Sequence, residues 1–287
     1  MDHQRYPYEP TVGRAPLRWP GGARVAVWVV PNVDHYHLDG SGPLWTRQNA
    51  GHLPDNYNHA WRDYGPRVGI WRQMAIFDRY GVRVTASLNA EVCDQYPLVV
   101  EEGLRRGWEF MGHGLSSSYS LAGLAEDEER AVIAGTLDRI EQATGRRPRG
   151  WLGPSLAETP RTPELLVEAG VDWVADWCAD DQPFPLRVEG GSLLALPYTV
   201  ELNDIPICLH QSHTGREFYA AVRDQFDVLY AEGWESGRVM ALSLHPFVTG
   251  QPHRARYLDQ ALAYVTGHPH VWLATGSEIA DAYRAQR

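Results

Sequence analysis

The stretch ARVAVWVVPNV, residues 23–33, is an almost unbroken run of apolar and β-branched side chains. Such a run is typical of a strand that is buried on both faces, as in a parallel sheet. From residue 69 onward, amphipathic segments alternate with short apolar runs, which predicts an α/β fold with a parallel sheet or barrel. The expected helices are 69–81, 97–107, 125–144, 162–170, 216–233, 255–266 and 277–285. The further expected strands are 82–89, 108–114, 149–155, 171–177, 191–200, 238–247 and 270–274.

The chain is predicted to form one domain with an N-terminal arm. Residues 1–22 are polar and contain proline and glycine, so we expect them to dock on the rest of the chain. Residues 34–65 hold glycine, proline, asparagine and several aromatic side chains, and we expect a loop that serves function or assembly. No repeat, low-complexity segment or linker divides residues 23–287.

The charged side chains exclude several classes of protein. The 287 residues include 36 acidic and 26 basic side chains, for a net charge of -10, and every basic one is arginine. Without lysine there is no Schiff-base chemistry, no pyridoxal-phosphate lysine and no phosphate-loop lysine. The acidic balance argues against nucleic acid as a partner. No apolar run reaches the ~18 residues of a membrane span, and the N-terminus lacks a secretory pattern, so we expect a cytoplasmic protein.

Several catalytic motifs are absent. Cys93, Cys178 and Cys208 form no CxxC pair, so we expect small buried side chains rather than a zinc knuckle or disulfides. Residues 114–118 read GLSSS, which is not a GxSxG nucleophile elbow. No GxGxxG follows the first strand, so a dinucleotide fold has no support.

Polar side chains follow seven consecutive expected strands. In a barrel of this kind the site lies where strands end and loops begin. A carboxylate with two imidazoles can serve as base, oxyanion stabiliser and acid, which hydrolysis of a carbonyl compound needs. The strand-end residues are Asp34, His35, Asn89, Glu91, His113, Trp151, Pro154, Asp176, Asp180, Asp181, Glu201, Asn203, Asp204 and His245.

The histidine spacing gives no standard metal motif. His35 and His37 are two residues apart, and His210 and His213 are three apart, so no His-x3-His pair exists. Asp34 and His113 are candidate metal ligands, but the residue four after His113 is a serine and no third ligand is evident. A divalent metal such as zinc is therefore left open as a cofactor.

The chain resembles the polysaccharide deacetylase superfamily, and within it the branch of allantoinase-like and cyclic-imide-hydrolase-like proteins. The resemblance implies an irregular barrel of about seven strands, a (β/α)7-type α/β fold in a single domain. It is carried by an ordered series of stretches from about residue 20 to the C-terminus. These are RDYGPRVGIWR (62–72), ASLNAEVCDQYP (86–97), GHG (112–114), TGRRPRGWLGPSLAETPRTPELL (144–166), DWCADDQPF (176–184), LPYTVELND (196–204) and LHPFVTGQPHR (244–254).

The chain departs from the sugar deacetylases of that superfamily at their active-site motifs. Their first strand ends in paired aspartates, whereas PNVDH here leaves Asp34 as the counterpart. Their His-x3-His keeps only His113, because Ser117 stands at the second position. The arginine motif is replaced by GWLGP, while the last motif survives as LSLH ending at His245. These departures favour the branch that opens small cyclic amides.

The predicted function is hydrolysis of a non-peptide C–N bond in a small cyclic amide, either a ureide such as allantoin or a cyclic imide. We expect Asp34 to activate or orient water, His113 to hold the oxyanion with backbone N–H groups, and His245 to protonate the leaving nitrogen. Zinc, if bound, is expected on Asp34 and His113. The expected substrate-binding residues are Trp151, Pro154, Asp181, Glu201, Asn203 and Arg254.

Two alternatives stay open from the sequence. One is a metal-dependent deacetylase of an N-acetylated sugar or amine, which would need tightly bound zinc. The other is a barrel without catalysis that only binds a small molecule. In every case we expect a small-molecule ligand and a homo-oligomer, which members of this branch often form, with neither nucleic acid nor membrane as partner.

Overall fold

The computed structural model of the chain describes residues 3–39 and 52–287. At its centre is β1 (Val25–Val33), whose nine residues are all buried, as the apolar run predicts. β1 pairs in parallel with β2 (Thr85–Leu88), β8 (Arg238–Leu244) and β9 (Val271–Leu273). The other strands are β3 (Glu109–Gly112), β4 (Gly150–Trp151), β5 (Trp173–Val174), β6 (Phe184–Leu186) and β7 (Leu193–Ala195).

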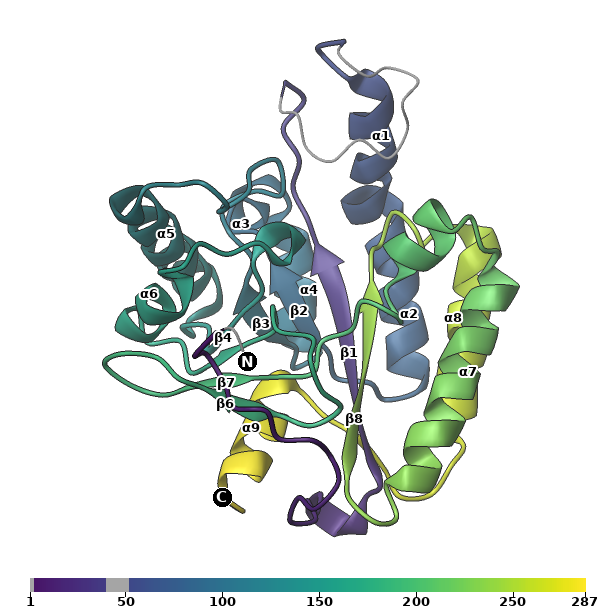
Figure 1. The fold of residues 1–287 in the computed structure, drawn as a ribbon. Coiled ribbons are helices and arrows are strands. Elements are labelled where there is room, and N and C mark those ends of the chain that lie inside the picture. Colours follow the sequence, from purple (N-terminus) through teal and green to yellow (C-terminus); the bar gives the residue numbers. More distant parts are fainter. Residues whose placement is uncertain (1–2, 40–51) are drawn as a thin grey trace.

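The described strands form one curled sheet in the order β6-β7-β5-β4-β3-β2-β1-β8 (Figure 1). All of their pairings are parallel except β6–β7. At the β8 edge, irregular chain continues the sheet: the Val239 N–H donates to the Asp181 carbonyl at 2.8 Å, and the Ser243 N–H to the Leu202 carbonyl at 3.1 Å. The predicted single α/β domain is confirmed, as a half-barrel whose gap is bridged by loop segments.

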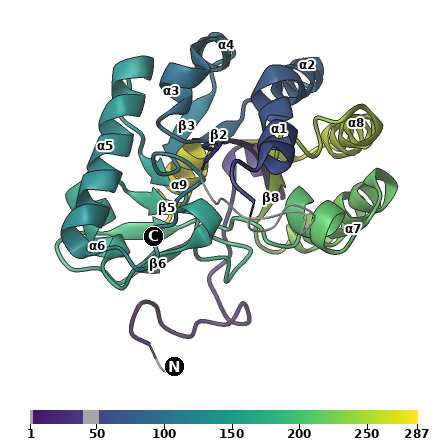
Figure 2. The ribbon, with the colours of Figure 1, turned by 90° about the horizontal axis from the view of Figure 1, so that it is seen from above.

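Helices surround the curled sheet, as the view from above shows (Figure 2). α7 and α8 lie side by side next to β8, while α5 and α6 lie together at the opposite end, where α5 packs against β3 (Figure 1). Most bounds agree with the expected helices because each segment carries an apolar stripe that the sheet buries. The bounds are α2 (Ile70–Arg79), α3 (Val92–Gln95), α4 (Pro97–Arg105), α5 (Glu126–Thr144), α6 (Thr162–Glu168), α7 (Gly215–Glu232), α8 (Pro252–Thr266) and α9 (Gly276–Arg284).

Aromatic side chains fill the inside of the curl. Trp28 and Trp173 pack edge to face with ring centroids 5.7 Å apart, and Tyr198 lies 6.2 Å from Trp28. A side chain at Gly150 would place its Cβ 2.1 Å from the Trp173 ring, so only glycine allows this packing. These rings therefore form part of the packed interior of the curl.

The expectation of a loop over residues 34–65 is wrong for its last part, which forms α1 (Asn56–Tyr64). The Asp55 side chain caps this helix by accepting a hydrogen bond from the Asn58 N–H at 3.1 Å. The segment has little regular apolar periodicity, so the pattern did not indicate a helix. Residues 40–51 of the same stretch lie outside the described residues.

The described part of the arm, residues 3–22, contains one short 3-10 turn, Pro20–Gly22. It docks through an ion pair between Arg5 and Glu164 and through Leu17, which is fully buried. None of the described helices is long and apolar enough to cross a membrane.

Candidate active site at the carboxyl edge of the sheet

Asp34 and His113 meet where β1 and β3 end. His113 Nε2 lies 3.5 Å from Asp34 Oδ1, and neither side chain is more than 8% exposed. His113 Nδ1 donates to the Leu152 carbonyl at 2.6 Å, which leaves Nε2 as the acceptor of the neutral ring. Burial lowers the pKa of His113, while the charge of Asp34 and the bond to Leu152 oppose that shift only in part. A neutral imidazole lone pair therefore faces a carboxylate oxygen.

His245, which follows β8, is held by a fully buried carboxylate. Its Nδ1 donates to Asp204 Oδ1 at 2.7 Å, and its backbone N–H donates to Asp204 Oδ2 at 2.8 Å. The Thr249 hydroxyl donates to the same Oδ2 at 2.6 Å. Burial disfavours the charged ring, but the charge and hydrogen bond of Asp204 outweigh it and raise the pKa of His245. Asp204 thus favours the protonated form of His245 and leaves its Nε2 outside this network.

The structure brings Asp34, His113 and His245 into one electrostatic group. The charge of Asp34 raises the pKa of both imidazoles, and the charge of His245 lowers the pKa of His113. The surroundings therefore favour the neutral form of His113 and the protonated form of His245. Titratable groups with oppositely shifted pKa values are the arrangement that acid–base catalysis uses.

Asn89, which follows β2, connects these loops. Its Oδ1 accepts from the His35 N–H at 2.9 Å and from the Ser117 N–H at 3.0 Å, and its Nδ2 donates to the His113 carbonyl. The Ser117 hydroxyl lies 2.7 Å from Asp34 Oδ1 and 2.9 Å from Asn89 Oδ1. The positions of Asp34 and His113 are therefore fixed by one buried amide.

The Asp34–His113 pair does not fit a zinc site with three protein ligands. Zinc sites use thiolate, imidazole or carboxylate donors, usually three or more of them. The third position here is Ser117, a neutral hydroxyl whose proton points to Asp34 Oδ1 or Asn89 Oδ1. The pair therefore offers two donors and a hydroxyl that is already hydrogen-bonded, which is one donor fewer than such a zinc site needs.

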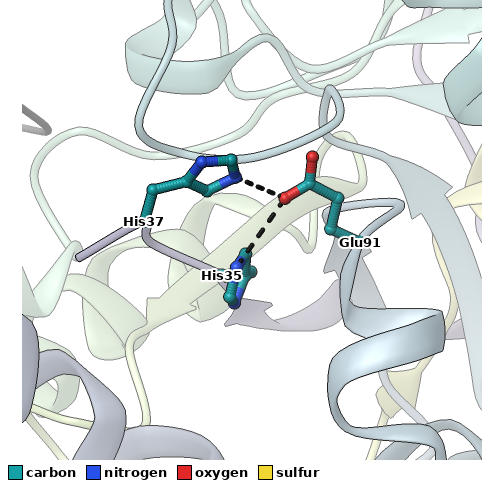
Figure 3. Close-up of side chains that lie close together, drawn as sticks. All are labelled: His35, His37 and Glu91. Atoms are coloured by element: carbon teal, nitrogen blue, oxygen red, sulfur yellow. Dashed lines mark hydrogen bonds and ion pairs between the residues drawn. The ribbon is translucent and has the colours of Figure 1, made fainter. Parts of the chain in front are cut away.

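A second group of metal-ligand type lies on the neighbouring loops. His35, His37 and Glu91 offer donor atoms that all lie within 4.8 Å of one another, and the close-up shows both imidazoles directed toward the carboxylate (Figure 3). The sequence lists His35 and Glu91 at strand ends but does not show that His37 joins them.

Asp181 and Glu201, predicted to bind substrate, do not join the three catalytic candidates. Both line a cavity of about 1320 Å³ between the N-terminal arm and the β6–β7 hairpin, together with Arg14 and Cys178. The Asp181 carbonyl lies at the β8 edge, where it accepts from the Val239 N–H. Asp181 lies seven residues beyond the end of β5 and Glu201 six residues beyond the end of β7, so neither directly follows a strand, and the chain there lines a different hollow.

Trp151 and Pro154, predicted to wall the pocket, have different positions. Trp151 is fully buried in the apolar cluster under α5 and α6, where its ring fills the space left by Gly112. This packing explains the indole at position 151 without a role in substrate binding. The Pro154 ring lies against Gly114, directly after His113, so it does border the site loop.

Arg254 and Asn203, which were also predicted to bind substrate, make contacts within the fold. Arg254 lies in the first turn of α8, next to Gly215 at the start of α7. Its Nε is buried with no hydrogen-bond partner among the described residues. Asn203 caps the turn that contains Asp204, because its Oδ1 accepts from the Ile205 N–H at 3.0 Å. Asn203 thereby positions the carboxylate that holds His245.

Sequence reasoning missed Tyr36 and Arg62 and did not single out Asp204. The Tyr36 hydroxyl interacts with Asp34 and Ser117, and burial raises its pKa. The Arg62 guanidinium lies over the Tyr36 ring at 4.2 Å and is buried, and its Nε and Nη2 have no hydrogen-bond partner among the described residues. Asp204 stood in the strand-end series, but only the fold shows that it faces His245.

A curled sheet with a carboxylate and two imidazoles at its carboxyl edge is suited to hydrolysis by acid–base catalysis. Residues 61–174 match the family described as polysaccharide deacetylase. Over this stretch, which is less than half of the 287 residues, the chain is similar to that family.

Similar proteins cover nearly the whole chain. A protein of Schizosaccharomyces pombe (strain 972 / ATCC 24843), named putative polysaccharide deacetylase, is 28% identical over an alignment of 299 positions that covers 93% of this chain and 92% of that protein. A probable polysaccharide deacetylase of Pseudomonas aeruginosa PAO1 has a TM-score of 0.88, 26% identity and coverage of 98% and 99% of the two chains. PuuE allantoinase has a TM-score of 0.88 and 27% identity, and 98% of each chain is covered.

Proposed function

We propose that the protein opens a small cyclic amide, either a ureide of the allantoin type or a cyclic imide. The observation that carries the proposal is the pair of acceptors, Asp34 Oδ1 and His113 Nε2, 3.5 Å apart and within electrostatic range of His245, whose pKa is raised. A water molecule between the two acceptors could donate one hydrogen to each, which would turn its lone pairs toward a ring carbonyl.

This proposal revises the role that the sequence suggested for His113. Its Nδ1 proton is engaged by the Leu152 carbonyl, so the neutral ring has no proton on Nε2 to give to an oxyanion. His113 is better suited to accept a proton from water, together with Asp34. The donor for the developing oxyanion would come from His245 Nε2 or from backbone N–H groups.

The proton balance of the reaction then closes within three side chains. Water adds to the carbonyl carbon and loses its proton to Asp34 or His113. The C–N bond of the tetrahedral intermediate breaks, and His245 Nε2 gives its proton to the ring nitrogen. The products are a free N–H and a carboxylic acid on the same opened molecule, and the acid releases its proton to solvent as it becomes a carboxylate. The proton taken up by Asp34 or His113 passes to His245, directly or through solvent, before the next water molecule binds.

The enclosure of the site supports a small substrate. The side chains of Asp34, His113 and His245 are 7%, 8% and 11% exposed. Tyr36 and Arg62 fill the space beside Asp34. A polymer chain needs an open groove to reach the reacting atoms, whereas a single ring fits an enclosed site. The resemblance to PuuE allantoinase over 98% of both chains points in the same direction.

A second candidate function, removal of an acetyl group from an N-acetylated sugar or amine, uses the same acid–base set. It is favoured by the names of the Schizosaccharomyces pombe and Pseudomonas aeruginosa proteins. Two protein donors and a serine at the Asp34–His113 pair count against it, since we expect that activity to need tightly bound metal.

A substrate panel on metal-stripped and zinc-supplemented protein tests the proposal. The panel contains allantoin, hydantoin, dihydrouracil, succinimide and an N-acetylated sugar, and ring opening is followed by liquid chromatography of the products. We expect turnover of a ureide or an imide that survives metal stripping. Turnover of the acetylated sugar alone, and only with zinc, would replace the proposal by the second candidate.

Two variants show whether a measured activity belongs to this site. His245→Ala should lower kcat by ~10²-fold or more, whereas Asp259→Asn, an outer-surface change on α8, should leave kcat unchanged. Equal turnover by His245→Ala and the parent protein would remove His245 from the mechanism. The expected homo-oligomer stays a prediction, which analytical ultracentrifugation of the same protein preparation tests.

A further inference from the structure

The chain after β1 directs two imidazoles to one side. Residues 34–37 have no helical structure and continue the strand direction, so alternate side chains point to opposite sides. Tyr36 points inward to Asp34 and Arg62. His35 and His37, on either side of it, therefore point together toward the loop after β2, where Glu91 lies.

Both imidazoles present the same nitrogen to the same carboxylate oxygen (Figure 3). His37 Nε2 lies 2.6 Å from Glu91 Oε2, and His35 Nε2 lies 3.7 Å from it. Two donors at ~2.1 Å from a tetrahedral zinc ion are ~3.4 Å apart. The three atoms thus need shifts of about an ångström or less to surround one ion, and the His37–Glu91 hydrogen bond would be exchanged for metal bonds.

The opposite nitrogen of each ring has a phenol beside it. His35 Nδ1 lies 3.3 Å from the Tyr96 hydroxyl, which donates to Asp63 at 3.2 Å, and His37 Nδ1 lies 3.5 Å from the Tyr119 hydroxyl. Metal-binding histidines are usually oriented by a polar partner on the nitrogen that does not bind the metal. This arrangement is independent of the three donors and points to Nε2 as the ligand atom of both rings.

Backbone hydrogen bonds hold the two loops in place without an ion. The His37 N–H donates to the Ser118 hydroxyl at 2.8 Å, and the Glu91 N–H donates to the Leu115 carbonyl at 3.1 Å. The loop after β3 therefore joins the loops that carry His37 and Glu91. Their donors are fixed by the fold, which lowers the ordering cost of binding.

The group opens onto solvent on one side. The side chains of His35, Glu91 and His37 are 13%, 22% and 35% exposed. They border a hollow of about 560 Å³. Three protein donors with room for water match the open type of zinc site, which has three protein ligands and a water molecule.

We propose that His35, His37 and Glu91 form a binding site for a divalent transition-metal ion of the zinc type. Two imidazoles and one carboxylate suit zinc and its first-row neighbours better than magnesium or calcium, which take oxygen ligands. The ion would tie the loop after β1 to the loop after β2. This site is separate from the Asp34–His113 pair and does not depend on the proposed function.

The test is metal binding by the full chain without an affinity tag. Equilibrium dialysis against zinc with metal analysis gives the stoichiometry, and the visible absorption of bound Co²⁺ reports the coordination. We expect one zinc ion per chain for the parent protein. His37→Ala and the near-isosteric Glu91→Gln should each weaken zinc binding by at least ~100-fold, beyond the ~10–100-fold typical of an outer partner.

Two matched histidine controls separate this site from others. His213→Ala removes an exposed histidine, and His113→Ala removes the imidazole that faces Asp34. Both should bind zinc like the parent protein. If His113→Ala loses the ion while His37→Ala keeps it, the metal belongs to the Asp34–His113 pair and the proposal is wrong.

Thermal unfolding with and without zinc keeps the test valid for variants of reduced stability. Zinc should raise the Tm of the parent protein, because binding to the folded state alone stabilises it. It should not raise the Tm of His37→Ala or Glu91→Gln. A parent protein that binds no zinc, or an equal rise in Tm for parent and variants, would also overturn the proposal.

Discussion

Replacement of Asp204 by asparagine should disable His245 while preserving the shape of the site. Asp204 is fully buried and accepts three hydrogen bonds, two from His245 and one from Thr249. Asparagine has the same size but no charge, and one side of its amide can only donate. The variant therefore removes the interaction that outweighs burial in raising the pKa of His245.

The expected magnitude follows from these contacts. Without the carboxylate, burial of the ring dominates, so the pKa of His245 falls and the ring is largely neutral at neutral pH. Loss of a positioned general acid costs ~10²–10⁴-fold in kcat, which corresponds to ~3–5.5 kcal/mol in the activation barrier. The backbone N–H of His245 or the Thr249 hydroxyl loses a good acceptor, which should cost ~1–3 kcal/mol of folding stability.

The assay is the pH dependence of kcat on whichever substrate the panel identifies, with urea unfolding of the same samples. For the parent protein the alkaline limb reports His245, and in Asp204→Asn this limb should move to lower pH while the acid limb stays. Thr249→Val, which removes one hydrogen bond and keeps the charge, should leave the alkaline limb in place. An alkaline limb that does not move in folded Asp204→Asn would refute the assignment of His245 as an acid held by Asp204.

Three further predictions concern the parent site and the packing around it. The pH–rate profile of the parent protein should be bell-shaped. Burial lowers the pKa of His113 below the ordinary 6.5, and Asp204 raises the pKa of His245 above it. A single limb centred near 6.5 would contradict the two roles. The same pKa shifts change folding stability with pH. His245 should stabilise the fold below the unfolded pKa of histidine and lose this contribution as pH rises through its raised pKa. His113 should stabilise the fold at higher pH and lose this contribution as pH falls through its lowered pKa. Urea unfolding of His245→Ala and His113→Ala across pH measures the two opposite slopes, and parallel stability profiles would disprove the sign of one of them. Gly150→Ala should destabilise the fold by ~1–3 kcal/mol or more, since its Cβ would lie 2.1 Å from the Trp173 ring, and an unchanged urea midpoint would show that the indole can move.

The amino-acid sequence by itself determined the elements and the edge of the sheet at which the site lies. The apolar run of β1 and the stripes of α5 and α7 are local patterns, because burial on one or two faces dictates their period. The helix α1 was not predicted because its sequence is polar overall. The Asp55 side chain caps its first turn. Asp34, His113 and His245 could be named because each directly follows a strand.

Only the tertiary structure decided which strand-end residues meet. Asp204 and His245 are 41 residues apart and come together because chain beyond β7 bridges to β8. The connection between β5 and β6 carries Asp181, and the chain beyond β7 carries Glu201, into another cavity. His37 joins Glu91 through the alternation of an extended segment and the register of two loops. Such pairings depend on long-range contacts whose free energy no local pattern encodes, so the sequence shows the side chains but not their partners.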